Sequence, residues 1–327
     1  MTLYRNIFKN ALKNSWRYKY LWFFGLFTAL LGNGGELDFI VKGFNGYNFE
    51  DGLFPVLKQY ASTGVFNISN ILQTASNDPI SMLIATCIFL IIIAISAFLI
   101  WLIMTSQVAL VNNSANIIGN KKHNFKQGLS AGIKKFLPVL GLNFLLKMAI
   151  YIIFILLSIP IIMSLSYNNG FSSSLLFIIL FIIFIPLSIV LSFVTKYSVG
   201  FVVIKNKKFI QSIKDGFKLF KDNWLVSIEM AIALYIINIL VAVSLFIVFL
   251  ILAIPFIFLF ILIIELKLIS IFWIVFFIAI LFYFILLITT GSILAVFQTF
   301  SWTNLFVELT SKGAVSKITR IFDKVKK

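Results

Sequence analysis

The chain has 327 residues, of which 61% are hydrophobic and only 12% charged, and its mean hydropathy is +1.06. A soluble globular domain has about 45–50% apolar and about 25% charged residues, so these values exclude a water-soluble fold. The net charge is +16, and because Cys87 is the only cysteine, an intrachain disulfide is excluded.

Continuous apolar runs along the chain predict an all-α, polytopic integral membrane protein that forms one membrane domain over residues 1–327. Most of the runs exceed the ~20 residues that cross a bilayer as a helix. The first run is short, and we expect Trp16 and Tyr18 to extend it while Arg17 and Lys19 reach the interface with their charged ends. The six predicted spans are 20–31, 82–111, 136–165, 174–204, 225–264 and 269–300.

The placement of Lys and Arg predicts the orientation, because cytoplasmic segments next to membrane spans accumulate these residues. Segments on one side of the membrane hold 22 of the 27 Lys and Arg, so we expect both termini in the cytoplasm. This topology explains the basic excess, and no nucleic-acid recognition module interrupts the spans, so we expect no nucleic-acid partner. The cytoplasmic segments are 1–19, 112–135, 205–223 and the amphipathic tail 301–327, whereas 32–81 is a solvated outer loop.

Three cytoplasmic segments, 8–17, 125–134 and 209–218, align without gaps over ten residues and each begins with Phe. Each precedes an outward-going span, which predicts three repeated units of one cytoplasmic amphipathic helix and one membrane hairpin. The alternative is that any basic juxtamembrane helix in such a chain shows this pattern. The N-terminus also resembles a signal peptide, but its match to the internal copies predicts that residues 1–31 are retained.

Basic amphipathic helices of this kind lie in the headgroup plane and contact anionic lipid. Their small residues recur four positions apart and permit close approach of another helix; the pairs are Ala11 with Ser15, Gly128 with Gly132 and Ser212 with Gly216. The candidate headgroup contacts are Arg5, Lys9, Lys13, Arg17, Lys134, Lys135, Lys214 and Lys218.

Catalytic and metal-binding motifs are missing from the sequence. It contains no nucleophile elbow, no phosphate-binding loop, no His-Glu-x-x-His and no Cys-x-x-Cys. We therefore expect no enzymatic activity, no metal site and no cofactor, and we expect His123 to be solvated in a basic loop.

Three ionisable residues fall within predicted spans, where burial of charge is costly and function is the default hypothesis. Counted from the cytoplasmic end, Lys147 lies roughly 15 Å deep, Lys196 about 12 Å and Glu229 about 8 Å. We predict an ion pair of Glu229 with Lys147 or Lys196. The alternative is that both lysines reach the phosphates, which is favoured for Lys196.

Prolines and amides also occur within the predicted spans. Pro160, Pro186 and Pro255 predict bent helices that could open an outward-facing cavity. We expect interhelical hydrogen bonds rather than a permeation path from the amides Gln107, Asn143, Asn238 and Gln298.

The stretch Tyr4–Lys9, with Tyr20–Phe27 and the following Leu31–Glu36, resembles uncharacterised multi-pass bacterial membrane proteins. The repeated unit is similar to the membrane domain that accompanies some glycerophosphoryl diester phosphodiesterases. That resemblance implies a membrane fold and no catalytic role, because the phosphodiesterase chemistry belongs to a separate soluble barrel that this sequence lacks.

The leading hypothesis is a non-enzymatic scaffold or accessory component of the bacterial inner (cytoplasmic) membrane that contacts anionic lipid or a protein partner. The alternative is a transporter or lipid-handling protein with a polar cavity near Lys147 and Glu229. A third interpretation is an accessory subunit whose activity needs another chain.

Overall fold

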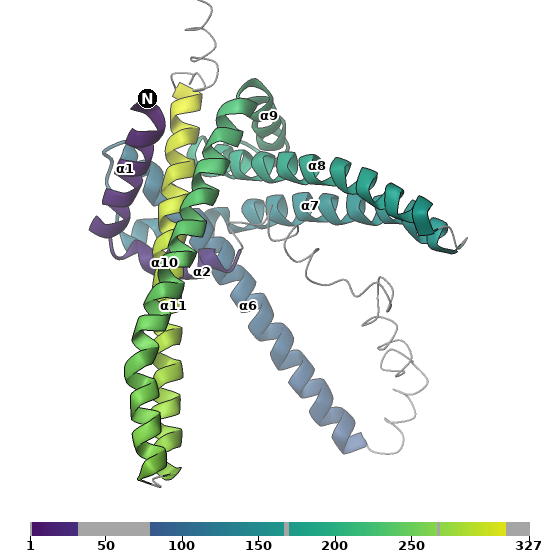
Figure 1. Cartoon of the computed structure of the whole chain (residues 1–327). Coiled ribbons are helices and arrows are strands. Elements are labelled where there is room, and N and C mark those ends of the chain that lie inside the picture. Colours follow the sequence, from purple (N-terminus) through teal and green to yellow (C-terminus); the bar gives the residue numbers. More distant parts are fainter. Residues whose placement is uncertain (1, 32–78, 167–169, 267–268, 312–327) are drawn as a thin grey trace, which may run out of the picture. The chain divides into compact units, whose positions relative to one another are not determined.

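The computed structural model of the protein describes residues 2–31, 79–166, 170–266 and 269–311 (Figure 1). Of these residues 93% are helical, and no strand occurs among them, which confirms the all-α prediction. The helices are α1 (Thr2–Arg17), α2 (Leu21–Ala29), α6 (Pro79–Ile118), α7 (Phe125–Ser166), α8 (Gly170–Ile204), α9 (Phe209–Asp222), α10 (Trp224–Glu265) and α11 (Ile269–Ser311).

Five of these helices, α6, α7, α8, α10 and α11, are long and apolar enough to cross a membrane. Their positions coincide with the last five predicted spans. Large apolar side chains are exposed along much of their length, as expected of surfaces that face lipid rather than water. The apolar stretches are Thr86–Ile118, Phe125–Leu156, Ile182–Ile204, Trp224–Glu265 and Ile271–Ser311.

The first predicted span, 20–31, corresponds to α2, which has only 9 residues. At 1.5 Å per residue α2 is about 14 Å long, less than half of the ~30 Å hydrocarbon core. The six-span count is therefore not confirmed. Most of the predicted outer loop 32–81 and of the predicted tail 301–327 lies outside the described residues.

The predicted cytoplasmic loop 112–135 is mostly helix, because α6 continues to Ile118 and α7 begins at Phe125. The second Phe-led segment is thus the start of α7 and not a separate helix, which corrects the prediction. The Asn124 side chain caps α7 by accepting a hydrogen bond from the Gln127 amide at 2.7 Å. The stretch Lys134-Lys135-Phe136 contains no helix-breaking residue, so α7 continues through it. By contrast, Asn223, with φ −132°, separates α9 from α10.

The chain divides into two compact units, one of residues 1–34 and 103–327 and the other of residues 35–102. The packing described below belongs to the first unit. Within it α7 lies along α8, and α10 lies along α11 (Figure 1).

The core of the first unit is aromatic and aliphatic. Phe24, Phe193, Tyr197 and Phe300 are among its fully buried side chains. A second cluster joins the aliphatic faces of α6, α7 and α8 through residues such as Val108, Val139, Leu142 and Val199.

Candidate functional site

The small residues of the second Phe-led segment, 125–134, allow α7 to lie directly against α6. A Cβ atom added at Gly132 would lie 2.6 Å from the carbonyl oxygen of Thr105, and one at Gly128 would overlap the Asn113 side chain. Both distances are shorter than ordinary van der Waals contact. The predicted close approach of helices is therefore confirmed for this segment.

The third segment, which lies in α9, packs on α8 in the same way. A Cβ atom at Gly216 would lie 2.5 Å from the Ser198 hydroxyl oxygen and 3.2 Å from the Val194 carbonyl oxygen. Ser212, one turn earlier, is fully buried, and its hydroxyl donates to the Lys208 carbonyl. The two internal segments thus cover the helix that precedes each of them in the chain.

The first segment lies in α1 and packs on α11, the last helix. Ala11 and Ser15 are buried, and the Phe8 and Phe297 rings stack with centroids 6.0 Å apart. The α2 helix continues this contact, because a Cβ at Gly25 would lie 2.5 Å from the Ser292 carbonyl oxygen. The three segments therefore bury equivalent small residues on three different helices, α11, α6 and α8.

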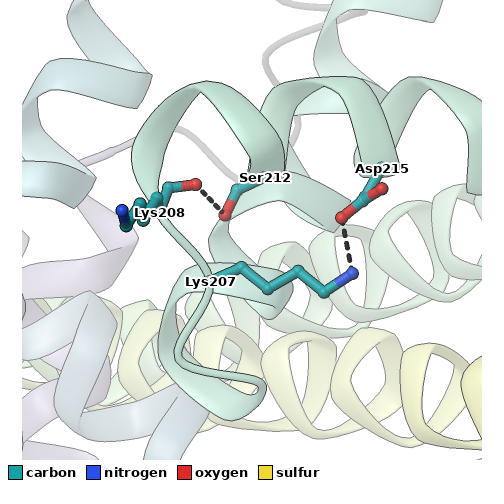
Figure 2. Close-up of polar contacts among 4 residues, drawn as sticks. All are labelled: Lys207, Lys208, Ser212 and Asp215. Carbon is teal, nitrogen blue, oxygen red and sulfur yellow. Dashed lines mark hydrogen bonds and ion pairs between the residues drawn. The ribbon is translucent and has the colours of Figure 1, made fainter.

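The two internal segments also share the turn that leads into them. Asn120 and Asn206 both have positive φ, 51° and 53°, and each is followed by two lysines. Asn tolerates this left-handed conformation better than most residues, so it ends each preceding helix cleanly. In the second turn the Lys207 ammonium contacts the Asp215 carboxylate at 2.5 Å, as Figure 2 shows. The sequence alignment missed the shared Asn-Lys-Lys because it began at Phe.

Seven of the eight predicted headgroup contacts are exposed. Opposite the buried small residues of α1 and α9, cations alternate with large apolar side chains that are also exposed. Leu12 and Trp16 are each 54% exposed in α1, and Phe217 is 52% exposed in α9. Ile133 is 52% exposed in the start of α7. The exposed cations are Arg5, Lys9, Lys13, Arg17, Lys134, Lys214 and Lys218.

Lys135, the eighth predicted headgroup contact, forms hydrogen bonds to other groups of the protein. Its ammonium donates to the Val203 carbonyl at 2.7 Å, to the Val202 carbonyl at 3.2 Å and to the Asn206 side-chain oxygen. These carbonyls belong to the last turn of α8, where the helix dipole favours a cation. Lys135 therefore caps α8 from α7.

The predicted ion pair of Glu229 with Lys147 or Lys196 stays a prediction. Lys147 is exposed on α7. Glu229, near the start of α10, accepts a hydrogen bond from the Tyr4 hydroxyl and so ties α1 to α10. The Lys196 ammonium lies 4.7 Å from the centroid of the Trp302 ring and 5.7 Å from that of Phe193.

His123 is partly buried between aromatic rings, where the sequence predicted a solvated loop residue. The Tyr20 hydroxyl lies 3.1 Å from its Nδ1, and the Tyr18 ring meets it edge-on with centroids 4.7 Å apart. The two tyrosines come from the connection between α1 and α2. The N-terminal segment and the turn between α6 and α7 are therefore neighbours.

A cavity of about 70 Å³ with a largely apolar wall lies among α2, α6, α8 and α11. Two amides in its wall, Gln107 and Gln298, form the predicted interhelical hydrogen bonds. Asn143 of α7 donates to the Gln107 carbonyl oxygen at 2.9 Å, and Gln298 donates to Asn238 of α10. The cavity is lined by Thr28, Gln107, Val111, Lys196, Tyr197, Val199, Gly200, Ile204, Gln298, Thr299, Trp302, Thr303 and Phe306.

The sequence did not predict this cavity at Lys196. Trp302 and Thr303 were missed because they come from a helix about a hundred residues further along, and no local pattern brings them to Lys196. Within the described residues, no group of three or more His, Cys, Asp or Glu side chains could hold a metal ion.

No family model matches the chain, and neither a curated protein nor a solved structure matches it. The similarity to the membrane domain that accompanies glycerophosphoryl diester phosphodiesterases therefore stays a prediction.

Proposed function

We propose that the protein is a non-enzymatic scaffold or accessory component of the bacterial inner membrane that holds anionic lipid along its cytoplasmic face. The observation that carries this proposal is the side-by-side exposure of cations and large apolar residues on all three Phe-led segments. In α9, for example, Lys214 lies within one helical turn of both Ile210 and Phe217, and all three are exposed. Such a face places apolar side chains at the acyl boundary and ammonium groups at the phosphates.

The proposal includes six crossings, arranged as three hairpins, with both termini in the cytoplasm. The contact of Tyr20 with His123 supports an even number of crossings between these residues, because neighbours at a membrane surface lie on the same side. One of these crossings is α6. A second crossing would then lie within residues 21–78 and would begin with α2. Labelling of single cysteines at Asn10 and Lys122 of a Cys87→Ser variant, which we expect from the cytoplasmic side only, tests this topology.

Lipid binding is tested with the full chain in nanodiscs of phosphatidylcholine with or without phosphatidylglycerol. The variant K9Q/K13Q/K214Q/K218Q removes four exposed cations, and K9R/K13R/K214R/K218R is the charge-preserving control. Each cation near an anionic surface is worth about 1 kcal/mol, so the Gln variant is expected to lose up to about 4 kcal/mol of phosphatidylglycerol preference. The preference of the wild type should also fall with salt.

An equal preference for phosphatidylglycerol in the Gln variant and the wild type would contradict the lipid proposal. If the wild type shows no preference for the anionic lipid at all, these segments bind a protein partner or nothing. The Arg variant separates charge from size, because it keeps every positive charge while changing each side chain.

A transporter or lipid-handling role is the second candidate, and the cavity among α2, α6, α8 and α11 favours it. That cavity lies beside Lys196, however, and neither Lys147 nor Glu229 lines it. Glu229 instead helps to hold α1 in place through Tyr4.

A further inference from the structure

Two segments that lie far apart in the sequence meet beside His123. The Tyr18 ring meets the His123 ring edge-on with centroids 4.7 Å apart, and the Tyr20 hydroxyl lies 3.1 Å from the His123 Nδ1. Tyr20 and His123 are 103 residues apart in the chain. These contacts hold the connection between α1 and α2 against the turn between α6 and α7. We call this place, formed by residues 17–20 and 121–123, the His123 junction.

The junction brings together positive charges from both of its segments. The Arg17 guanidinium carbon lies 5.7 Å from the centroid of the Tyr18 ring, which lies 4.7 Å from the centroid of the His123 ring. The guanidinium is therefore at most about 10 Å from the His123 ring, whose own segment supplies two lysines. The four exposed cations of the junction are Arg17, Lys19, Lys121 and Lys122.

Neither segment of the junction supplies a carboxylate to compensate these charges. Residues 1–31 and 79–214 contain no Asp and no Glu. The corresponding turn before α9 differs, because the Lys207 ammonium there contacts the Asp215 carboxylate at 2.5 Å (Figure 2). The same ammonium also lies 4.9 Å from the centroid of the Phe201 ring. The charge of that turn is thus partly compensated within the protein, whereas the His123 junction suits an external anion.

Aromatic residues next to the junction favour a lipid as the source of that anion. The Trp16 and Trp22 rings meet edge-on with centroids 5.7 Å apart, and Trp16 is 54% exposed. Trp and Tyr are enriched where a membrane protein meets the lipid headgroups. The α6 helix, one of those long enough to cross a membrane, ends at Ile118, directly before the turn of the junction. This placement favours lipid phosphates over soluble anions.

We infer that the His123 junction binds a phospholipid with two phosphates, of the cardiolipin class, with one phosphate at the cations of each segment. The inference rests on the proposed lipid-binding function and specifies one site for it. Two linked phosphates suit the junction because the tyrosine–histidine contacts hold two pairs of cations near each other. Basic pockets between membrane helices on the cytoplasmic side bind headgroups of this kind. The single phosphate of phosphatidylglycerol would engage only one pair.

The test measures the affinities of the full chain in detergent for cardiolipin and for phosphatidylglycerol by native mass spectrometry, with lipid concentrations expressed per phosphate. Because two linked phosphates bind jointly, the wild type is expected to bind cardiolipin at least about tenfold more tightly. K121Q/K122Q should weaken cardiolipin binding about thirtyfold, which corresponds to two cations worth about 1 kcal/mol each. R17Q/K19Q should have a similar effect from the other segment, whereas K121R/K122R, which preserves the charge, should bind as the wild type does.

The matched control is K214Q/K218Q, which removes two exposed lysines of α9 and therefore the same charge outside the junction. It should change the ratio of the two affinities less than about twofold. The inference is overturned if the wild type binds both lipids equally per phosphate, or if K214Q/K218Q lowers the ratio as much as K121Q/K122Q. The proposed function stands in either case if the wild type still prefers phosphatidylglycerol to phosphatidylcholine, and it fails as well if that preference is absent.

Discussion

Replacement of Gly132 by Ala tests the close packing of α7 on α6. A Cβ atom at this position would lie 2.6 Å from the Thr105 carbonyl oxygen, and ordinary contact begins at 3.4 Å. The two helices would have to separate by about 0.8 Å, because a backbone carbonyl cannot move aside by changing rotamer. Separation of that size forfeits about a quarter to a half of the dispersion energy of the contacts concerned.

Two opposing energies decide the outcome. Overpacking of a well-packed interface costs about 1–3 kcal/mol, and the better helix propensity of Ala returns about 1 kcal/mol. We therefore expect G132A to lower the free energy of unfolding by about 0–2 kcal/mol. G291A is the matched control, since a Cβ at Gly291 in α11 meets nothing within 4 Å. That variant should gain about 1 kcal/mol from propensity alone.

The assay is equilibrium unfolding in mixed detergent micelles, with the free energies of both variants compared with the wild type. The expected difference between G132A and G291A is about 1–3 kcal/mol. If G132A is as stable as G291A, the small residues of the Phe-led segment do not set the distance between α7 and α6, and the packing argument fails.

Three further variants test single contacts by the same assay. Lys135→Met removes a charged donor from the last carbonyls of α8 and should lower the free energy of unfolding by about 1.5–3 kcal/mol. The control Lys134→Met changes an exposed neighbour and should leave the free energy of unfolding almost unchanged. Equal losses in the two variants would contradict the capping role of Lys135. Tyr197→Phe removes the buried hydroxyl that lies 2.6 Å from Ser227 and should cost about 0.6–1.7 kcal/mol, while a loss near zero would show that this bond contributes nothing. Asp215→Asn breaks a partly exposed ion pair, so we expect a loss below about 1 kcal/mol that disappears in high salt; a larger, salt-independent loss would show that the carboxylate is structural.

The helical class and the positions of the long apolar helices were predictable because hydropathy is a property of local composition. The ends of those helices were not. Residues 112–116 are mostly polar and were predicted as loop, but they continue α6 as helix because the start of α7 covers them. Asn113 lies beneath Gly128 there, and this contact is tertiary. A hydropathy profile detects where a helix leaves the apolar region, not where it ends.

The same distinction between local sequence information and tertiary contacts applies to the candidate sites. Helical periodicity predicted which cations of α1 and α9 are exposed, because this periodicity can be recognised directly in the sequence. The role of Lys135 could not be predicted in this way, because its acceptors are 67 and 68 residues further along the chain. The Tyr4 partner of Glu229 is 225 residues away in the sequence, so no local pattern could predict this hydrogen bond.

The cavity lies among the helices that the Phe-led segments cover. These helices, α6, α8 and α11, supply most of its lining. They contribute Gln107, Lys196 and Gln298 to it. If the cavity were only a packing defect, Lys196→Gln would match the neighbouring helices, avoid the cost of a charge at that depth and stabilise the fold. If instead the Lys196 ammonium contributes to packing through its contact with the Trp302 ring, Lys196→Gln lowers the free energy of unfolding.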